Sequence, residues 1–191
     1  MKLTARSTLS DVAVTVGDAL RRAGIRAVLT GGACANLYTR GAHLSLDADF
    51  VLVEPCTADD LDRTLADLGF ERQRDRYVHR RVPFVVEFPR GPLGIGEDFK
   101  IRPVWLSRRG AKTLALSATD ACRDRLAAFY HWNDRQSLAV AVIIASRNPV
   151  SLAKIRSWSR SEGHPEGYGV FLEERARKSI ARGRRRPAQK G

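Results

Sequence analysis

Residues 46–53 alternate between two kinds of side chain, and this alternation restricts the fold more than any other part of the chain. Successive side chains of a strand point to opposite faces, so the segment predicts a strand with one apolar and one acidic face. The apolar face would carry Leu46, Ala48, Phe50 and Leu52, and the other face Asp47, Asp49 and Val51. Asp47 and Asp49 would repel each other unless a cation neutralised them, and hard carboxylate oxygens suit Mg²⁺ or Mn²⁺. Exposed strands also carry paired acids without a ligand, so the pair alone does not establish a metal site.

Two glycines precede the acidic strand at the start of a predicted helix. Ile25–Leu29 is typical of a short buried strand that ends at Thr30–Gly31–Gly32, and Ala33–Tyr38 predicts a short helix directly after the glycines. Backbone N–H groups at such a helix start bind phosphate oxygens, and glycine permits the close approach. Ser45 would donate its hydroxyl to a phosphate oxygen. An ordinary tight turn and an ordinary loop serine are the alternatives.

A third acid, Glu87, lies inside the apolar run 84–88. An ionised acid in such a run is costly unless it has a partner. A metal ion shared with Asp47 and Asp49 would be that partner. The alternative is an edge strand whose glutamate faces water.

The order of the predicted elements indicates an α+β protein with a mixed sheet flanked by helices and a helical C-terminal part. We expect helices over 9–23, 33–38 and 57–68, strands over 25–29, 46–53, 71–79 and 82–88 and near 104–105 and 113–116, and later helices that begin near 117, 133, 151 and 170. A loop is expected over 163–169, where glycine and proline alternate with other residues. The chain would divide into a core (1–116), a C-terminal helical part (117–181) and a disordered basic tail (182–191).

The charge of the chain favours a polyanionic partner. Its 191 residues include 33 Lys and Arg against 21 Asp and Glu, which gives a formal net charge of +12. An excess of this size favours nucleic acid and argues against a cationic substrate such as an aminoglycoside. The alternative is excess arginine that serves only solubility.

The cysteines and the apolar segments predict a cytoplasmic protein with no membrane partner. Cys34, Cys56 and Cys122 are odd in number and lack a C-x-x-C spacing, so we expect reduced thiols. The N-terminus lacks the apolar core of a signal peptide. The longest apolar run, Leu138–Ala145, is too short to span a bilayer.

Taken together, these motifs resemble the nucleotidyltransferase (polymerase-beta-like) superfamily. Its pattern is an apolar strand, Gly-Gly or Gly-Ser, a short helix, Asp-x-Asp between apolar residues, and a third acid between apolar residues on a later strand. The matching segments are Val28–Ala33, Ser45–Phe50 and Val86–Phe88. The resemblance implies the nucleotidyltransferase fold, in which Asp47, Asp49 and Glu87 are the catalytic metal ligands. It also implies that Gly31, Gly32 and Ser45 hold a nucleoside triphosphate.

The C-terminal part is similar to the AbiEii-type nucleotidyltransferases, many of which are toxins of toxin–antitoxin systems. The residues that carry this similarity are Thr119–Phe129 and Asn133–Gln136. Members of that group have a lysine in the first of these helices and an Arg-Asp pair further on. Arg125 stands at the position of the lysine, and Asp134 lies near that of the later pair. The resemblance therefore adds Arg125 and Asp134 to the nucleotide-binding residues.

The resemblance implies an enzyme that transfers a nucleoside monophosphate from a triphosphate such as ATP to a hydroxyl acceptor. Mg²⁺ would be the cofactor, with Mn²⁺ as the alternative. The positive charge makes an RNA 3′ end, tRNA in particular, the expected acceptor and a protein hydroxyl the second choice. A cognate antitoxin would be the protein partner.

Two other classes of function stay open. Because arginine is not equivalent to lysine, Arg125 is compatible with a degenerate member that binds nucleotide or RNA without catalysis. A non-catalytic, antitoxin-like partner protein is the other class. The basic hairpin residues Arg72, Arg74, Arg76, Arg80 and Arg81 would contact RNA phosphates or would simply be solvated.

Overall fold

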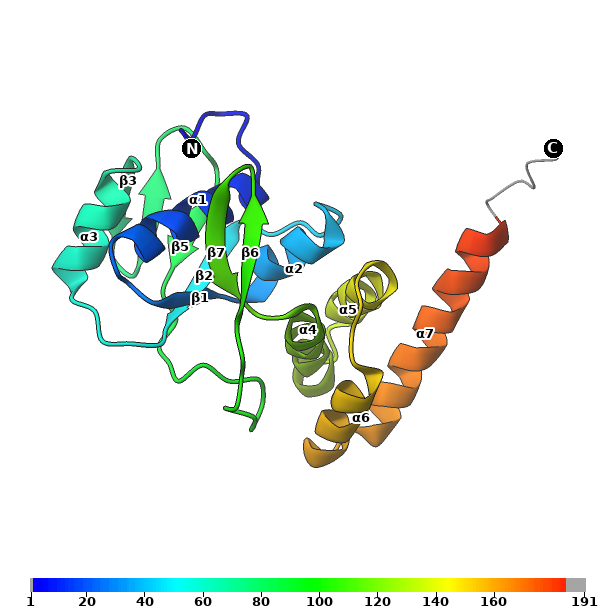
Figure 1. The fold of residues 1–191 in the computed structure, drawn as a ribbon. Coiled ribbons are helices and arrows are strands. Elements are labelled where there is room, and N and C mark those ends of the chain that lie inside the picture. Colours follow the sequence, from blue (N-terminus) through cyan, green and yellow to red (C-terminus); the bar gives the residue numbers. More distant parts are fainter. Residues whose placement is uncertain (1, 185–191) are drawn as a thin grey trace.

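The computed structural model describes residues 2–184, and side chains as far as residue 180. Within this range helices and strands follow the order α1 (Leu9–Arg22), β1 (Ala27–Leu29), α2 (Gly31–Thr39), β2 (Asp47–Leu52), α3 (Ala58–Ala66), β3 (Phe70–Gln73), β4 (Arg76–His79), β5 (Val85–Glu87), β6 (Val104–Arg108), β7 (Ala111–Ala115), α4 (Ala118–Trp132), α5 (Arg135–Arg147), α6 (Leu152–Ser161) and α7 (Pro165–Arg184). Figure 1 shows α1 lying across the sheet and the helices α4–α7 grouped beside it.

The strands in the described part of the chain form one mixed sheet. Their order is β3-β4-β5-β2-β1-β7-β6. The pairs β2–β5 and β1–β7 are parallel, and the other neighbours are antiparallel. The mixed sheet and the helical C-terminal part confirm the predicted α+β class.

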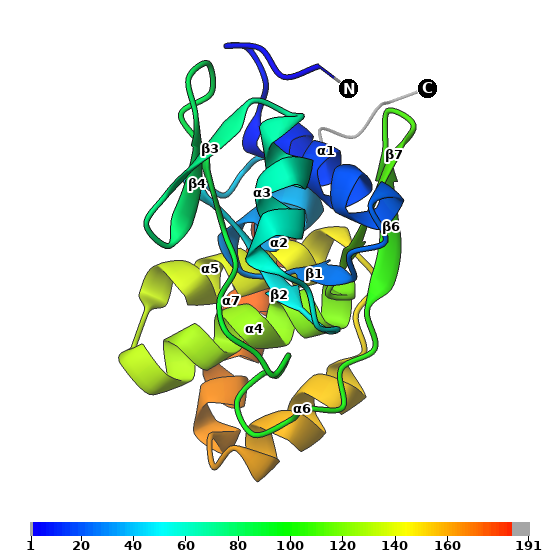
Figure 2. The same ribbon diagram turned by 90° about the vertical axis from the view of Figure 1, so that its left-hand side faces the viewer.

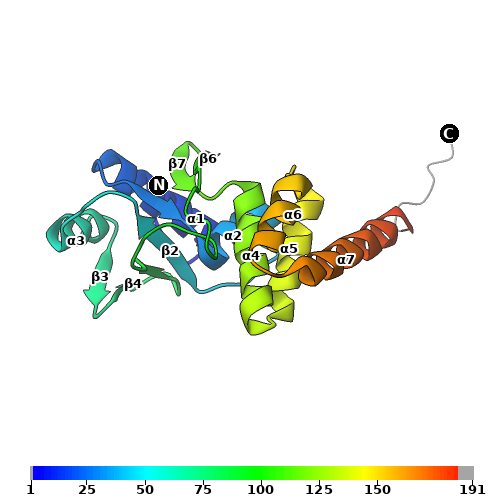
Figure 3. The ribbon, with the colours of Figure 1, turned by 90° about the horizontal axis from the view of Figure 1, so that it is seen from below.

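Helices α1, α2 and α3 cover one face of the sheet. Helix α1 begins at a capping box, in which the Thr8 hydroxyl accepts from the Asp11 N–H and the Asp11 carboxylate accepts from the Thr8 N–H. It packs on β7 and β1, and α2 packs on β2. Ala48 and Phe50 of β2 are fully buried on this face. By strand alternation, Asp47 and Asp49 point to the opposite face. Figure 3 shows α1 on one side of the strands and α4–α7 as a separate group.

Residues 88–103 connect β5 to β6 and must cross the three strands β2, β1 and β7. This connection reaches the helical part, as Figure 2 shows. The Ile95 carbonyl accepts from the Trp158 indole N–H at 3.1 Å, and the Glu97 N–H donates to the Glu162 carboxylate at 2.9 Å. The crossing segment therefore joins the sheet to α6.

Arg123 of α4 lies at the centre of this junction. Its side chain has no exposed surface, and its two terminal nitrogens bind Asp120 at 2.8 Å and Asp98 at 2.5 Å. The guanidinium also lies over the Trp158 ring, 5.0 Å from the ring centroid. Lys154 adds a second cation to Asp120 at 2.8 Å. A single buried side chain thus holds together α4, α6 and the crossing segment.

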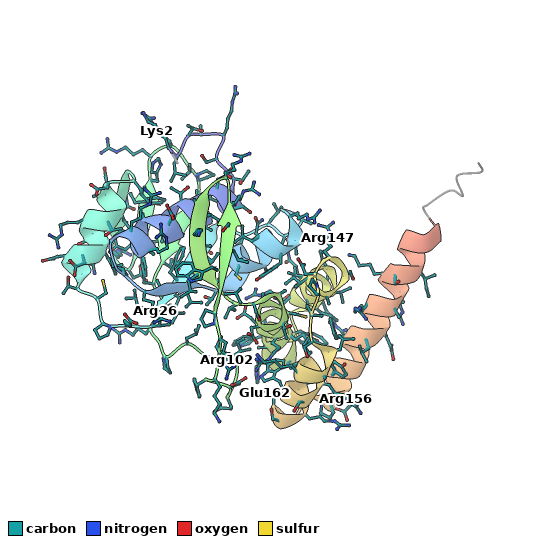
Figure 4. All side chains as sticks on the ribbon, in the orientation of Figure 1. Lys2, Arg26, Arg102, Arg147, Arg156 and Glu162 are labelled. Carbon is teal, nitrogen blue, oxygen red and sulfur yellow. The ribbon has the colours of Figure 1, made fainter. Side chains whose placement is uncertain are left out.

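Helix α2 is the other bridge between the sheet and the helical part. The Tyr38 hydroxyl donates to the Leu116 carbonyl at 2.8 Å, and the Asn148 amide donates to the Tyr38 carbonyl at 3.0 Å. Arg147 donates to the Thr39 carbonyl. Figure 4 shows Arg147 at the end of α5 next to α2.

Two predicted segments were wrong in their local structure. The expected strand over 71–79 is the hairpin β3–β4, which turns at Arg74 with a φ of 59°. The expected loop over 163–169 is helical from Pro165, and Gly167 lies within the helix, where it allows close packing instead of forming a turn. A Cβ on Gly167 would lie 2.6 Å from the Tyr130 ring. Helix α7 also extends to Arg184, into the predicted tail, whose remaining residues 185–191 lie outside the described part.

Other predicted boundaries were confirmed closely. Ser117, Asp134 and Ser151 are the N-caps of α4, α5 and α6, as their sequence positions indicate. None of the helices in residues 2–184 is long and apolar enough to cross a bilayer.

Replacing Arg123 by methionine tests the importance of this junction. We expect Arg123→Met to lower the free energy of unfolding by about 3 kcal/mol or more, because it leaves Asp98 and Asp120 without their buried cation. Urea denaturation monitored by circular dichroism measures the change. The control is Arg177→Met, which removes an exposed pair with Glu174 and should cost about 0.5 kcal/mol or less. Equal losses in the two variants would contradict this role of Arg123.

Candidate functional site

The predicted acids lie on two neighbouring parallel strands. Asp47 and Asp49 are on β2, and Glu87 is the last residue of β5. Asp49 is in register with Glu87, and Asp47 with Val85. Residues directly paired on adjacent strands share a face of the sheet. The topology therefore brings the three acids to the same face, at adjacent positions.

The glycine turn lies against the acidic row formed by Asp47, Asp49 and Glu87. The Thr30 N–H donates to the Asp49 carbonyl at 2.9 Å, so the start of α2 is tied to β2. Gly31 has a φ of 60°, and a Cβ there would lie 2.3 Å from Asp49 Oδ2. A Cβ on Gly32 would lie 2.5 Å from Ser45 Oγ. Both glycines are thus required by close approach to two predicted site residues.

The first turn of α2 has backbone donors available for a ligand. Its N-cap, Thr30, forms no side-chain capping hydrogen bond. The first N–H groups of a helix have no partner within the helix, and its dipole favours an anion there. The position next to Gly31 and Gly32 therefore suits a phosphate.

A buried asparagine holds the loop that carries Ser45. Asn36 of α2 accepts from the Ser10 hydroxyl at 2.6 Å and donates its amide to the His43 carbonyl. Ser45 in turn makes 3.4 Å contacts with the backbone N–H and carbonyl of Asp47. This chain of contacts links α1, α2 and the start of β2.

Helices α4 and α5 supply the other wall of the site. The Asp134 carboxylate caps α5 and accepts from the Gln136 N–H at 2.9 Å, the Ser137 N–H at 3.0 Å and the Ser137 hydroxyl at 2.7 Å. The Ser137 hydrogen bonds hold the pKa of Asp134 below its usual range. Arg125 is bound through two nitrogens by Asp124, at 2.7 and 3.1 Å.

Seven of the eight predicted site residues line one pocket of about 310 Å³. The lining residues are Gly31, Gly32, His43, Leu44, Ser45, Asp47, Asp49, Arg125, Asp134, Gln136 and Ser137. Glu87 is not among them, although its charge acts on Asp49. His43, Leu44, Gln136 and Ser137 were missed by sequence reasoning, and their only signal is adjacency to Ser45 and Asp134. Burial and the nearby Arg125 lower the pKa of His43, which favours a neutral ring near pH 7.

The electrostatics of the acidic row favour a bound cation. Burial, together with the charges of Glu87 and Asp47, raises the pKa of Asp49 to about 6, against the opposing effect of Arg125. Carboxylate oxygens are the donors that Mg²⁺ and Mn²⁺ prefer, so the residue types fit such an ion. Within residues 2–184 no three acidic, histidine or cysteine side chains already form a metal-binding group. The carboxylates would have to close around the ion.

Comparisons with known proteins agree with this architecture. No protein-family model matches the chain, and no curated protein matches it in sequence. Among solved structures, the chain is similar to an antigenic nucleotidyltransferase-like protein from Paracoccidioides brasiliensis, with 21% identity and a TM-score of 0.53. The alignment covers 72% of this chain and 73% of that one. This similarity establishes the fold, which is the nucleotidyltransferase fold that the motifs predict.

Neutralising Asp49 tests the repulsion within the acidic row. A carboxyl whose pKa is raised on folding destabilises the folded state as pH rises from its unfolded value, about 4, through its folded value. Asp49→Asn removes this effect. In metal-free buffer, the free energy of unfolding of the variant should therefore rise relative to that of the wild type by about 1–2 kcal/mol between pH 4 and pH 7.5, after allowance for solvent screening.

The measurement is chemical denaturation of both proteins at several pH values with EDTA. The difference in free energy of unfolding between the two proteins reports on Asp49 alone, because other carboxyls are common to both. One of these is Asp120, where hydrogen bonds from Lys154 and Ser117 overcome burial and lower the pKa. Asp75→Asn, at an exposed turn, is the control for the same Asp-to-Asn change outside the acidic row. A difference that stays constant with pH would contradict the raised pKa of Asp49.

Proposed function

We propose that the protein is a Mg²⁺-dependent nucleotidyltransferase that transfers a nucleoside monophosphate from a nucleoside triphosphate to a hydroxyl of an RNA. The observation that carries this proposal is the register of β2 and β5, which puts Asp49 beside Glu87, with Asp47 two residues away and the Gly31–Gly32 turn facing Asp49. The fold similarity supports the reaction class. The choice of acceptor rests on charge.

Each side of the pocket has a distinct task in this proposal. The uncapped first turn of α2 and the Ser45 hydroxyl would bind the oxygens of the triphosphate. Asp47, Asp49 and Glu87 would hold Mg²⁺, or Mn²⁺, which when bound supplies a Lewis acid for the attacking and leaving oxygens. Glu87, at the end of β5 and outside the pocket lining, would lie on the acceptor side and take the proton from the attacking hydroxyl.

Helices α4 and α5 would complete the nucleotide site. Arg125 lines the pocket and would supply a cation to a bound triphosphate, and Asp134 caps the start of α5. Uptake of a triphosphate would require Arg125 to exchange its hydrogen bonds with Asp124 for bonds to phosphate. The similarity of these helices to AbiEii-type enzymes favours a toxin of a toxin–antitoxin system, with a cognate antitoxin as partner and tRNA as the preferred acceptor.

The pairing of Arg125 also favours a second candidate function. Because Asp124 binds the guanidinium at 2.7 Å, the charge of Arg125 in the pocket lining is already neutralised. A protein that never releases this pair would bind nucleotide or RNA without turnover. Retained nucleotide binding with no transfer, in the experiment below, would support this candidate over the enzyme.

The direct test is incubation with each labelled triphosphate, Mg²⁺ and total RNA. We expect label to enter RNA, and Asp47→Ala to lower kcat/KM on the order of 10³-fold, because each metal ligand contributes to several kcal/mol of transition-state stabilisation. The control is Asp75→Ala, at the exposed turn between β3 and β4, which should retain the wild-type rate. Transfer that persists in Asp47→Ala would overturn the assignment of the site.

A pair of glycine variants tests the contact between the turn and the acidic row. Gly31 and Gly41 both have positive φ, at 60° and 81°, but only Gly31 approaches another side chain. Alanine at either position should cost about 1–2 kcal/mol of stability from backbone strain. Because the added methyl group must displace the Asp49 carboxylate, Gly31→Ala should also lose Mn²⁺ binding and transfer, whereas Gly41→Ala should keep both.

Calorimetry with Mn²⁺ and thermal denaturation provide the two measurements. Equal loss of Mn²⁺ binding in both variants would show that strain, and not the position of Asp49, controls the site.

A further inference from the structure

Next to the acidic row, the adjacent strand β4 carries a cation, Arg76. Glu87 of β5 is in register with Asp49 on one side and with Arg76 of β4 on the other. Directly paired residues share a face, so Arg76 points to the same face as the two acids. Tyr77, the next residue, points the other way, since it is buried and its hydroxyl donates to Asp62 of α3 at 2.7 Å.

Arg76 differs from Arg72 and Arg80 of the same hairpin in having no side-chain partner within the described part of the chain. It is exposed, and within residues 2–180 it forms no ion pair or side-chain hydrogen bond, not even with Glu87 across the strand. Arg72 pairs with Asp62 on the opposite face, at 3.5 Å, and Arg80 pairs with Glu71 at 2.9 Å. Of these three arginines, only Arg76 is both unpaired and on the face of the acids.

The spacing of the row limits what Arg76 can reach. Adjacent strands lie about 4.8 Å apart, so the backbones of Arg76 and Asp49 are separated by two spacings, or about 10 Å. A stacked nucleic acid strand advances about 3.4 Å per nucleotide. A strand whose terminal hydroxyl lay at the acids would therefore place a phosphate near Arg76 within its last three nucleotides or so.

We propose that Arg76 forms a phosphate subsite for the RNA acceptor and binds a backbone phosphate within about three nucleotides of the reacting 3′ end. This assignment rests on the proposed function, because it takes the acidic row as the place of the 3′ hydroxyl. An unpaired guanidinium beside carboxylates suits this task, since it attracts a phosphodiester to a face whose acids would otherwise repel it. Glu87 then lies between the bound phosphate and the acidic pair on β2.

The experiment measures RNA binding in the absence of triphosphate, so that no transfer takes place. The probe is a fluorescein-labelled RNA hairpin with a four-nucleotide single-stranded 3′ end, and the readout is fluorescence anisotropy at several salt concentrations. Arg76→Gln should weaken binding about 10-fold and reduce the slope of log K against log salt by about 0.7. Arg72→Gln, the same change on the opposite face of the same hairpin, should stay within about twofold of the wild type.

Neutral methylphosphonate linkages then locate the contact. Each of the last three phosphates of the probe is replaced in turn. For the wild type, one replacement should weaken binding by about the same factor as Arg76→Gln. For Arg76→Gln that same replacement should have no further effect, because the two changes remove one interaction.

The outcomes separate this proposal from the function on which it rests. RNA binding that depends on Arg76, with no transfer of label, supports the subsite and overturns the enzyme. Transfer with unchanged RNA affinity in Arg76→Gln overturns the subsite and leaves the enzyme. A change in kcat alone would assign Arg76 to the positioning of Glu87 and also overturn the subsite. Wild-type protein that does not bind the probe would overturn the subsite, and the enzyme would then be decided by transfer of label alone.

Discussion

Arg123 is fully enclosed by protein, and the arrangement of the two halves of the molecule depends on it. Its guanidinium binds Asp98 of the crossing segment and Asp120 of its own helix, and it covers the Trp158 ring of α6. Such a buried cation is stable only where all of its partners are in place. Because Arg123 and Arg125 are both on α4, the position of the pocket arginine follows from the same junction.

The site itself depends on two close approaches that only glycine permits. Gly31 leaves room for the Asp49 carboxylate, and Gly32 leaves room for Ser45. The start of a helix, which attracts anions, is thereby pressed against an acidic strand, which repels them. Burial, followed by the neighbouring charges of Glu87 and Asp47, raises the pKa of Asp49. A cation would relieve this repulsion and would join the phosphate-binding turn to the acids.

Local patterns in the sequence were sufficient for the fold class and for the strand and turn residues of the pocket, whereas Arg125 and Asp134 were predicted from the family resemblance. Strand alternation oriented Asp47 and Asp49, and caps such as Ser117 marked helix starts, because both depend on neighbouring residues alone. Arg123 could not be assigned, since its partner Asp98 lies 25 residues away in an irregular segment. Gly167 was read as a loop residue because its contact with Tyr130 is visible only in three dimensions.

The position of Arg76 beside the acids follows from topology. Glu87 lies next to Asp49 because β5 runs parallel to β2. The chain must therefore return, after β2, to the edge of the sheet at which β2 begins. It does so through α3 and the β3–β4 hairpin, and β4 then pairs with β5 on its outer side. The segment that brings the third acid into place must therefore present its own residue, Arg76, at the next position of the row. The same return of the chain therefore positions both Glu87 on β5 and Arg76 on β4. In the proposed function, the residue that binds the acceptor and the third acid would lie on consecutive strands.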